Sequence, residues 1–167
     1  MHALSKTLHK LGQALERIFH YICILLITVL VVIITIQVIF RVFFTAFSWT
    51  EEVSRFLLIY LSMVGTALAY RKGSHISIRL FHEKLSVHSG RIIDVVIHLA
   101  CLVFFMLMIR FSIQLIVKQQ FQVSGALQLP MQYIYMSIPI SMVAMTLFSI
   151  EMLADNICKL TEGRAAQ

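Results

Sequence analysis

The residues best suited to chemistry in this sequence are one acid–base pair and two distant histidines. Asp94 and His98 are four residues apart, so they share a face if the segment is helical. Because histidine titrates near neutral pH, this pair could relay a proton, but no acidic residue follows deeper along the segment, and we expect a structural hydrogen-bonded pair. His20 and His98 could hold a haem between two helices, which leaves a haem-binding redox subunit as an alternative. The sequence indicates no metal site, no cofactor and no enzyme active site.

A second group of charged residues lies just before an apolar run. Glu51 precedes Arg55 by four residues, the favourable order for an ion pair within a helix. Ser48 and Glu51 have the spacing of a capping box, with Thr50 as a rival N-cap. We therefore expect a capped helix start whose charges, with Glu52, either stabilise the helix end or contact a partner.

The composition determines which elements must position these residues. The chain has 167 residues, of which 59% are hydrophobic and 13% are charged, whereas a soluble domain has about a quarter charged residues. Each of four apolar runs is long enough to cross a bilayer as a helix of about 20 residues. The sequence therefore predicts an all-α integral membrane protein with one membrane domain over 1–167 and spans near 18–40, 53–70, 92–117 and 133–152. Pro139 should bend the last span.

Two further segments have an amphipathic pattern. Residues 4–17 repeat leucine at steps of three and four with basic residues between, which is typical of a helix lying on the membrane surface. Residues 74–85 carry an apolar face as well, and their alternating start also fits a short strand. Ser74 as an N-cap favours a helix.

Basic residues predict the orientation of the chain in its membrane. The two tails and the middle loop carry ten Lys and Arg residues, and the other two loops carry only Arg41 and Lys118. The positive-inside rule then places both termini in the cytoplasm. The N-terminal apolar run is too long for a signal peptide and is followed by no small-residue cleavage site, so we expect a retained anchor. The basic group Arg71, Lys72 and Arg91 could also hold an anionic lipid headgroup.

Small residues at helical spacing predict where helices pack closely. Gly65 with Ala69 form one such pair, Ser62 with Thr66 form another, and Ser137 with Ser141 form a third in the last span. Small residues allow helices to approach closely where lipid offers no hydrophobic incentive. The contact could lie within this chain or with another chain.

The order of these motifs resembles a known family, the small membrane subunit (DctQ type) of tripartite ATP-independent periplasmic (TRAP) transporters. The resemblance covers nearly the whole chain and rests on Arg41, Trp49-Thr50-Glu51-Glu52, Arg55, Gly65, the run Ala69 to Ile78 with Gly73 and His75, Leu127 to Pro130, and Ile138-Pro139. One departure is Arg79, at a position where the family often has an acidic residue.

The resemblance implies a multi-pass protein of the bacterial inner membrane. It further implies a function as one component of a sodium-coupled transporter for organic acids, such as sialic acids or C4-dicarboxylates. A large elevator-type membrane subunit would bind the solute, and a soluble periplasmic binding protein would deliver it. The small subunit would scaffold the large one and could help to dock the binding protein. A self-sufficient four-helix carrier or channel is the alternative from a different class, although few polar residues lie at mid-membrane depth.

Overall fold

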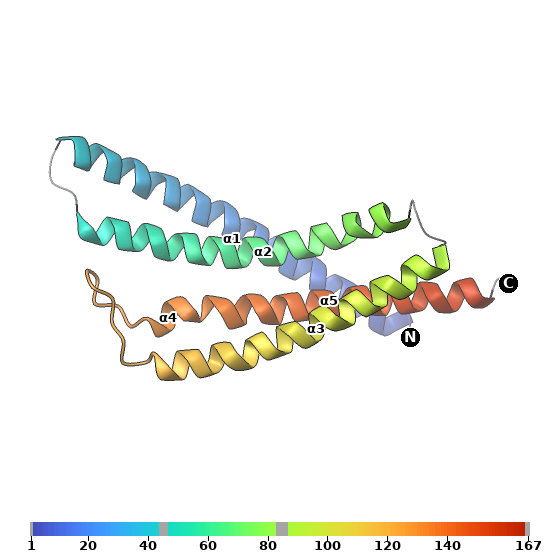
Figure 1. Ribbon diagram of the computed structural model, residues 1–167. Coiled ribbons are helices and arrows are strands. Elements are labelled where there is room, and N and C mark those ends of the chain that lie inside the picture. Colours follow the sequence, from blue (N-terminus) through green and yellow to red (C-terminus); the bar gives the residue numbers. More distant parts are fainter. Residues whose placement is uncertain (1, 44–46, 83–86, 166–167) are drawn as a thin grey trace.

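The computed structural model describes residues 2–43, 47–82 and 87–165 of the chain, and these residues form an elongated helical bundle (Figure 1). Its helices are α1 (His2–Phe43), α2 (Ser48–His82), α3 (Val87–Lys118), α4 (Gln132–Tyr135) and α5 (Ser137–Ala165). The described residues contain no strand beyond an isolated bridge between Val123 and Pro130. The predicted all-α fold is therefore confirmed.

Four helical segments are long and apolar enough to cross a membrane. They are His9–Phe43, Ser48–Gly73, Val95–Lys118 and Gln132–Ala154. Each contains or closely overlaps one predicted span, so the four-span prediction is confirmed. Both chain ends lie at one end of the bundle, which we call the terminal end, and the connection from α3 to α4 lies at the other, which we call the loop end (Figure 1).

The first helix is longer than the sequence analysis expected. Residues 4–17 and 18–40 belong to one continuous helix of 42 residues, about 63 Å long at 1.5 Å per residue. The segment contains no proline, and Gly12 is its one glycine, so nothing in it forces the helix to end. Whether its first turns rest on the membrane surface stays a prediction.

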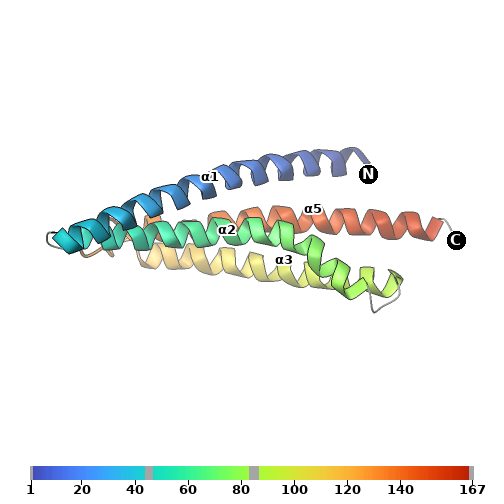
Figure 2. The same cartoon turned by 90° about the horizontal axis from the view of Figure 1, so that it is seen from above.

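The second helix also continues past its predicted span. Residues 74–82 are helical, which decides against the strand alternative, while residues 83–85 lie outside the described part. Figure 2 shows that α2 bends in its C-terminal part. Gly73 and Ser74 lie in this part, and Gly/Ser pairs are among the usual places where helices kink.

The last span is divided in two by Pro139. Proline has no N–H to donate to the carbonyl of Tyr135, and the helix is interrupted at Met136 between α4 and α5. The carbonyl of Ile134 accepts a backbone N–H at this interruption and also the Ser137 hydroxyl, at 2.8 Å. The predicted bend is thus a break close to the N-terminus of α5.

The core of the bundle is small and lies along α5. Helix α3 packs along α5, while α1 crosses α2 and the terminal half of α5 (Figures 1 and 2). Phe148 and Ala67 are fully buried, whereas none of the 18 most apolar consecutive residues of α1 is buried. Most large aliphatic side chains face outward, which suits a protein surrounded by lipid tails.

Candidate functional site

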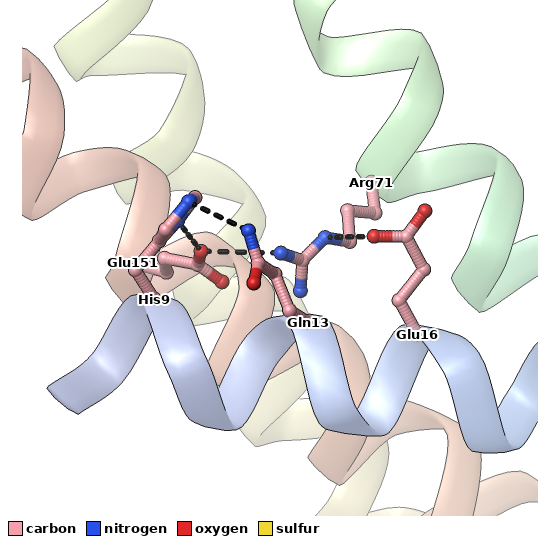
Figure 3. Close-up of polar contacts among 5 residues, drawn as sticks. All are labelled: His9, Gln13, Glu16, Arg71 and Glu151. Carbon is pink, nitrogen blue, oxygen red and sulfur yellow. Dashed lines mark hydrogen bonds and ion pairs between the residues drawn. The ribbon is translucent and has the colours of Figure 1, made fainter. Parts of the chain in front are cut away.

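A cluster of charged side chains joins three helices near the terminal end of the bundle (Figure 3). Arg71 of α2 lies at its centre, with only 8% of its side chain exposed. Its Nε atom is 2.9 Å from Oε2 of Glu16 on α1, and its Nη2 atom donates to Oε1 of Glu151 on α5 at 3.2 Å. A buried guanidinium needs such paired carboxylates, because desolvating an unpaired charge is costly. We call His9, Gln13, Glu16, Arg71 and Glu151 the ion cluster.

Two polar residues of α1 extend the ion cluster. Nδ1 of His9 lies 2.7 Å from the same Glu151 oxygen, and Nε2 of Gln13 lies 3.0 Å from Nε2 of His9. A neutral imidazole with its proton on Nδ1 satisfies both contacts, since it donates to the carboxylate and accepts from the amide. The first turns of α1 are therefore held to α5 as well as to α2.

Close helix approach makes the ion cluster possible. The guanidinium carbon of Arg71 lies 4.8 Å from the centre of the Phe148 ring, in the geometry of a cation–π contact. On the other side stands Gly12 of α1, where an added Cβ atom would overlap a carboxylate oxygen of Glu151 and Nη1 of Arg71. A side chain at position 12 would therefore displace the carboxylate of Glu151 and the guanidinium of Arg71 from their present positions.

Helical spacing explains how Arg71 comes to face inward. Val64, Ala67, Leu68 and Arg71 recur at steps of three and four, and all are buried on one face of α2. The structure thus places Arg71 among carboxylates of its own chain, where its charge is already compensated. Lys72 is exposed on the neighbouring face. The side chain of Arg91 lies outside the described residues, so a lipid role for Lys72 and Arg91 stays a prediction.

The sequence analysis did not single out Glu16, Glu151, His9 or Gly12. A signal was present, because Arg71 and Glu151 each stand near the terminal-end limit of an apolar span, and Glu16 stands just before the most apolar stretch of α1. Opposite charges at the same depth of neighbouring spans are expected to pair.

A second group of polar contacts, at the loop end, holds the connection between α3 and α4 against α2. One carboxylate oxygen of Glu52, in the first turns of α2, accepts hydrogen bonds from the backbone N–H groups of Ala126 at 3.0 Å and Leu127 at 2.8 Å. Such charge-assisted bonds are stronger than bonds between neutral groups. Glu52 therefore fixes the position of this connection relative to α2.

The connection has a defined turn structure, and we call residues 122–131 the loop-end turn. The N–H of Met131 donates to the carbonyl of Gln122 at 2.8 Å, and that of Ser124 donates to Leu129 at 2.9 Å. Gln128 has a φ of 54°, the left-handed conformation that lets the chain reverse. Pro130, predicted as a motif residue, closes the turn through its bridge with Val123.

The start of α2 is stabilised differently from the predicted capping box. The hydroxyl of Thr50, which is 2% exposed, donates to the carbonyl of Phe47 at 2.7 Å. Among the described residues no hydrogen bond joins Ser48 to Glu51, and no ion pair joins Glu51 to Arg55. The side chains of Glu51 and Arg55 are both exposed. Because water screens an exposed ion pair, such a pair would add little to the stability of the helix.

Other predicted residues at the loop end lie on the surface. Arg41 is exposed in the last turn of α1, and Trp49 is 48% exposed. The Phe47 ring lies 5.3 Å from that of Phe40 and 6.5 Å from that of Trp49, between ring centres. These aromatic side chains form one group at the end of the first two spans.

The small residues predicted to mediate helix contacts divide into two sets. Ser137 and Ser141 of α5 are 2% and 1% exposed, so they pack within this chain. Ser62 and Ala69 of α2 are exposed, and an added Cβ atom at Gly65 would meet no heavy atom within 4 Å. The α2 set is therefore not used for packing inside the bundle.

The remaining predicted residues can be located only in part. Gly73 is exposed on α2 and open to a side chain, and Pro139 produces the break before α5. The side chains of His75 and Asp94 lie outside the described residues. His98 is buried, and its carbonyl accepts a hydrogen bond from Ser149 at 3.2 Å, while His20 is exposed on α1. Within the described part, no group of three or more His, Cys, Asp or Glu side chains could hold a metal ion.

Comparison with known proteins agrees with this arrangement of membrane helices. Residues 30–159 match the family model described as the DctQ component of tripartite ATP-independent periplasmic transporters. The chain is 32% identical over 78 residues to a small permease protein of a TRAP transporter from Haemophilus influenzae, a match covering 46% of each chain. It is 43% identical over 37 residues to the sialic acid TRAP transporter small permease protein SiaQ of Vibrio cholerae, covering 22% of this chain and 21% of that protein.

A third relative is longer. The chain is 29% identical over 111 residues to the isethionate TRAP transporter permease protein DctMQ of Oleidesulfovibrio alaskensis, covering 65% of this chain but 18% of that protein. All three matches span less than half the length of the relative concerned. The family model, in contrast, covers more than three quarters of this chain, including α2, α3 and α4 in full. The chain therefore belongs to the DctQ family, the small permease component of TRAP transporters, which is a transport component and not an enzyme.

Proposed function

We propose that this chain is the fixed scaffolding subunit of a sodium-coupled TRAP transporter for organic acids, and that it binds a larger membrane subunit through α2. The observation that carries the proposal is a continuous exposed face of α2, opposite the bundle core. We call it the α2 stripe, and it consists of Arg55, Leu58, Ser62, Thr66, Ala69 and Gly73.

The α2 stripe has the chemistry of a helix-packing surface. Its middle is built from the small residues Ser62, Thr66 and Ala69, which allow another helix to approach closely. The hydroxyl of Ser62 donates to the carbonyl of Leu58 at 2.8 Å, and that of Thr66 donates to Ser62 at 2.6 Å. Because these hydroxyls are satisfied within α2, a partner helix could cover them without leaving a polar group unpaired.

The DctMQ relative supports a partner of this kind. The segment similar to this chain is 18% of that permease, so in that protein it is covalently continuous with much more permease sequence. We infer that the present chain makes a corresponding contact without the covalent link. Two relatives are named for different organic acids, sialic acid and isethionate, which supports an organic acid as solute and its recognition by other components.

The test of the interface is to add bulk to the stripe. Ala69→Leu should reduce recovery of the large subunit in an affinity pulldown from native membranes by about tenfold, since overpacking an interface costs about 1–3 kcal/mol. Ala100→Leu is the matched control, because Ala100 is equally exposed but lies on α3. Equal recovery of the large subunit with both variants would show that the α2 stripe is not part of the interface.

We further propose that the loop end contributes to docking of the soluble binding protein. Glu51, Arg41 and Trp49 are exposed at this end of the bundle, where Glu52 also holds the loop-end turn. Replacing Glu51 and Glu52 together by Gln should lower solute uptake by cells while the pulldown of the large subunit persists. Normal uptake by this double variant would restrict both residues to a local structural role.

Reconstitution in liposomes distinguishes the scaffolding role from the alternative of a self-sufficient carrier. Liposomes that contain this chain alone should show no flux of sialic acid or of a C4-dicarboxylate. Adding the large subunit and the binding protein should produce flux that depends on an inward sodium gradient. Flux through this chain alone would overturn the scaffolding role.

A further inference from the structure

We propose that a polar groove between α1 and α2 binds the phosphate-containing headgroup of an anionic phospholipid. The groove has a volume of about 480 Å³. It lies near the terminal end of the bundle and is lined by Gln13, Glu16, Arg17 and His20 of α1 and by Lys72 of α2. Four of its five lining residues therefore come from one face of α1, and Lys72 faces them from the neighbouring helix.

Two cations in the groove are available for an anion. Arg17 and Lys72 both have exposed side chains. Neither forms an ion pair with a carboxylate among the described residues. A phosphate between a guanidinium and an ammonium would receive charge-assisted hydrogen bonds from both.

The acidic residue in the groove does not cancel this charge. Glu16 is already paired with Arg71, whose Nε atom lies 2.9 Å from its carboxylate. Arg71 shares its single charge between Glu16 and Glu151, so these three side chains together carry one negative charge. Arg17 and Lys72 add two positive charges, which leaves the groove and its neighbours with a net positive charge of one. His20 would add to this charge when it is protonated.

The surface beside the groove favours a lipid over a free phosphate ion. Continuing along the same face of α1 from Gln13, Arg17 and His20, the next positions are Ile24, Ile27 and Val31. These three side chains are 49%, 48% and 57% exposed. A headgroup in the groove would therefore leave its acyl chains lying along an apolar strip that enters the membrane span.

The experiment is a lipid-binding titration by native mass spectrometry on the full-length chain after its native lipid is removed. Phosphatidylglycerol should bind more tightly than phosphatidylcholine of the same chain length. The double variant Arg17→Gln/Lys72→Gln should weaken phosphatidylglycerol binding by about thirtyfold, from the usual contribution of two basic residues at a membrane surface. The charge-preserving variant Arg17→Lys/Lys72→Arg should retain binding, which separates loss of charge from loss of fold.

Lys10→Gln is the matched control, because Lys10 is exposed near the same end of α1 but does not line the groove. It should leave phosphatidylglycerol binding unchanged. An equal loss with Lys10→Gln would show that diffuse surface charge attracts the lipid. Unchanged binding in the Gln double variant, or displacement of the lipid by inorganic phosphate, would overturn the proposal.

Discussion

At the scale of single residues, the ion cluster links α1 to α2 and α5 near the terminal end, beside the apolar contacts of Phe19 and Leu15 with the core. Arg71 contacts carboxylates from both neighbouring helices, so one side chain links α1, α2 and α5. In a membrane protein the hydrophobic effect does not drive helices together, and polar bonds of this kind gain relative importance. The cluster should therefore contribute measurably to stability.

Replacing Arg71 by Gln should lower the free energy of unfolding by about 3 kcal/mol, because two partly buried carboxylates lose their counter-charge. The midpoint of thermal unfolding in detergent should fall by roughly 6–12 °C. Lys72→Gln is the neighbouring control, since Lys72 is exposed and forms no ion pair among the described residues. Equal midpoints for the two variants would argue against a stabilising cluster.

Gly12 gives an independent test of the same contact. A methyl group there would overlap atoms of Glu151 and Arg71, so Gly12→Ala should destabilise the chain by about 1–2 kcal/mol. The same substitution at Gly65 meets no neighbouring atom and should be neutral or stabilise α2 by up to about 1 kcal/mol. Thermal unfolding of both variants measures the difference. A stable Gly12→Ala protein would mean that α1 can move away at little cost.

The same residues show where sequence reasoning stops. Ser137 and Ser141 were predicted at helix contacts and are buried, yet identical reasoning placed Ser62 and Ala69 there and they are exposed. The spacing of residues along a helix shows that they lie on the same face. It does not show whether that face packs inside the bundle or points outward. Glu16 and Glu151 were missed because their pairing with Arg71 depends on how three separate helices cross.

At the scale of elements, the loop-end turn depends on a residue from another element. Glu52 on α2 accepts two backbone hydrogen bonds from the turn, and the hydroxyl of Tyr60 donates to the carbonyl of Tyr133 on α4. The turn is thus attached to α2 as well as to its own flanking helices. Its geometry should respond to changes on α2.

Glu52→Gln should weaken the hydrogen bonds from the amides of Ala126 and Leu127, because the amide oxygen of Gln accepts them without the negative charge of the carboxylate. Hydrogen exchange of these amides should accelerate by about tenfold or more. Glu51→Gln is the adjacent control, as the Glu51 side chain is exposed and is not bonded to the turn among the described residues. Unchanged exchange in Glu52→Gln would mean that the turn holds its own structure.

The elements themselves were largely predictable from hydropathy. All four spans were found because a membrane requires long apolar helices with internally bonded backbones. The effect of Pro139 was also predictable in kind, since a proline near a helix start removes a donor. The continuity of α1 was not predicted, because a change from an amphipathic to an apolar pattern alters the surroundings of a helix without interrupting its hydrogen bonds.

At the scale of the whole molecule, the structure places both termini at the terminal end and the loop-end turn far from them (Figure 1). The basic residues predict that the terminal end faces the cytoplasm. In a background with Cys23, Cys101 and Cys158 replaced by Ala, a membrane-impermeant thiol reagent should label Gly125→Cys from outside in spheroplasts. Lys10→Cys should be labelled only after the membrane is permeabilised, and the reverse pattern would invert the topology.

The distribution of side chains in this bundle also determines which substitutions its sequence can tolerate. Apart from Phe148, the most deeply buried described positions hold small residues (Thr50, Ala67, Ser137, Ser141 and Ser149), while most of the isoleucine, leucine and valine side chains are exposed. Exchanging one outward aliphatic residue for another changes little, because lipid tails adapt to either shape. Exchanging Ser141 or Ser149 for a larger apolar residue would push α3 and α5 apart, although it makes the sequence more hydrophobic. Mutational tolerance at the buried positions of this protein should therefore follow side-chain volume more closely than hydropathy.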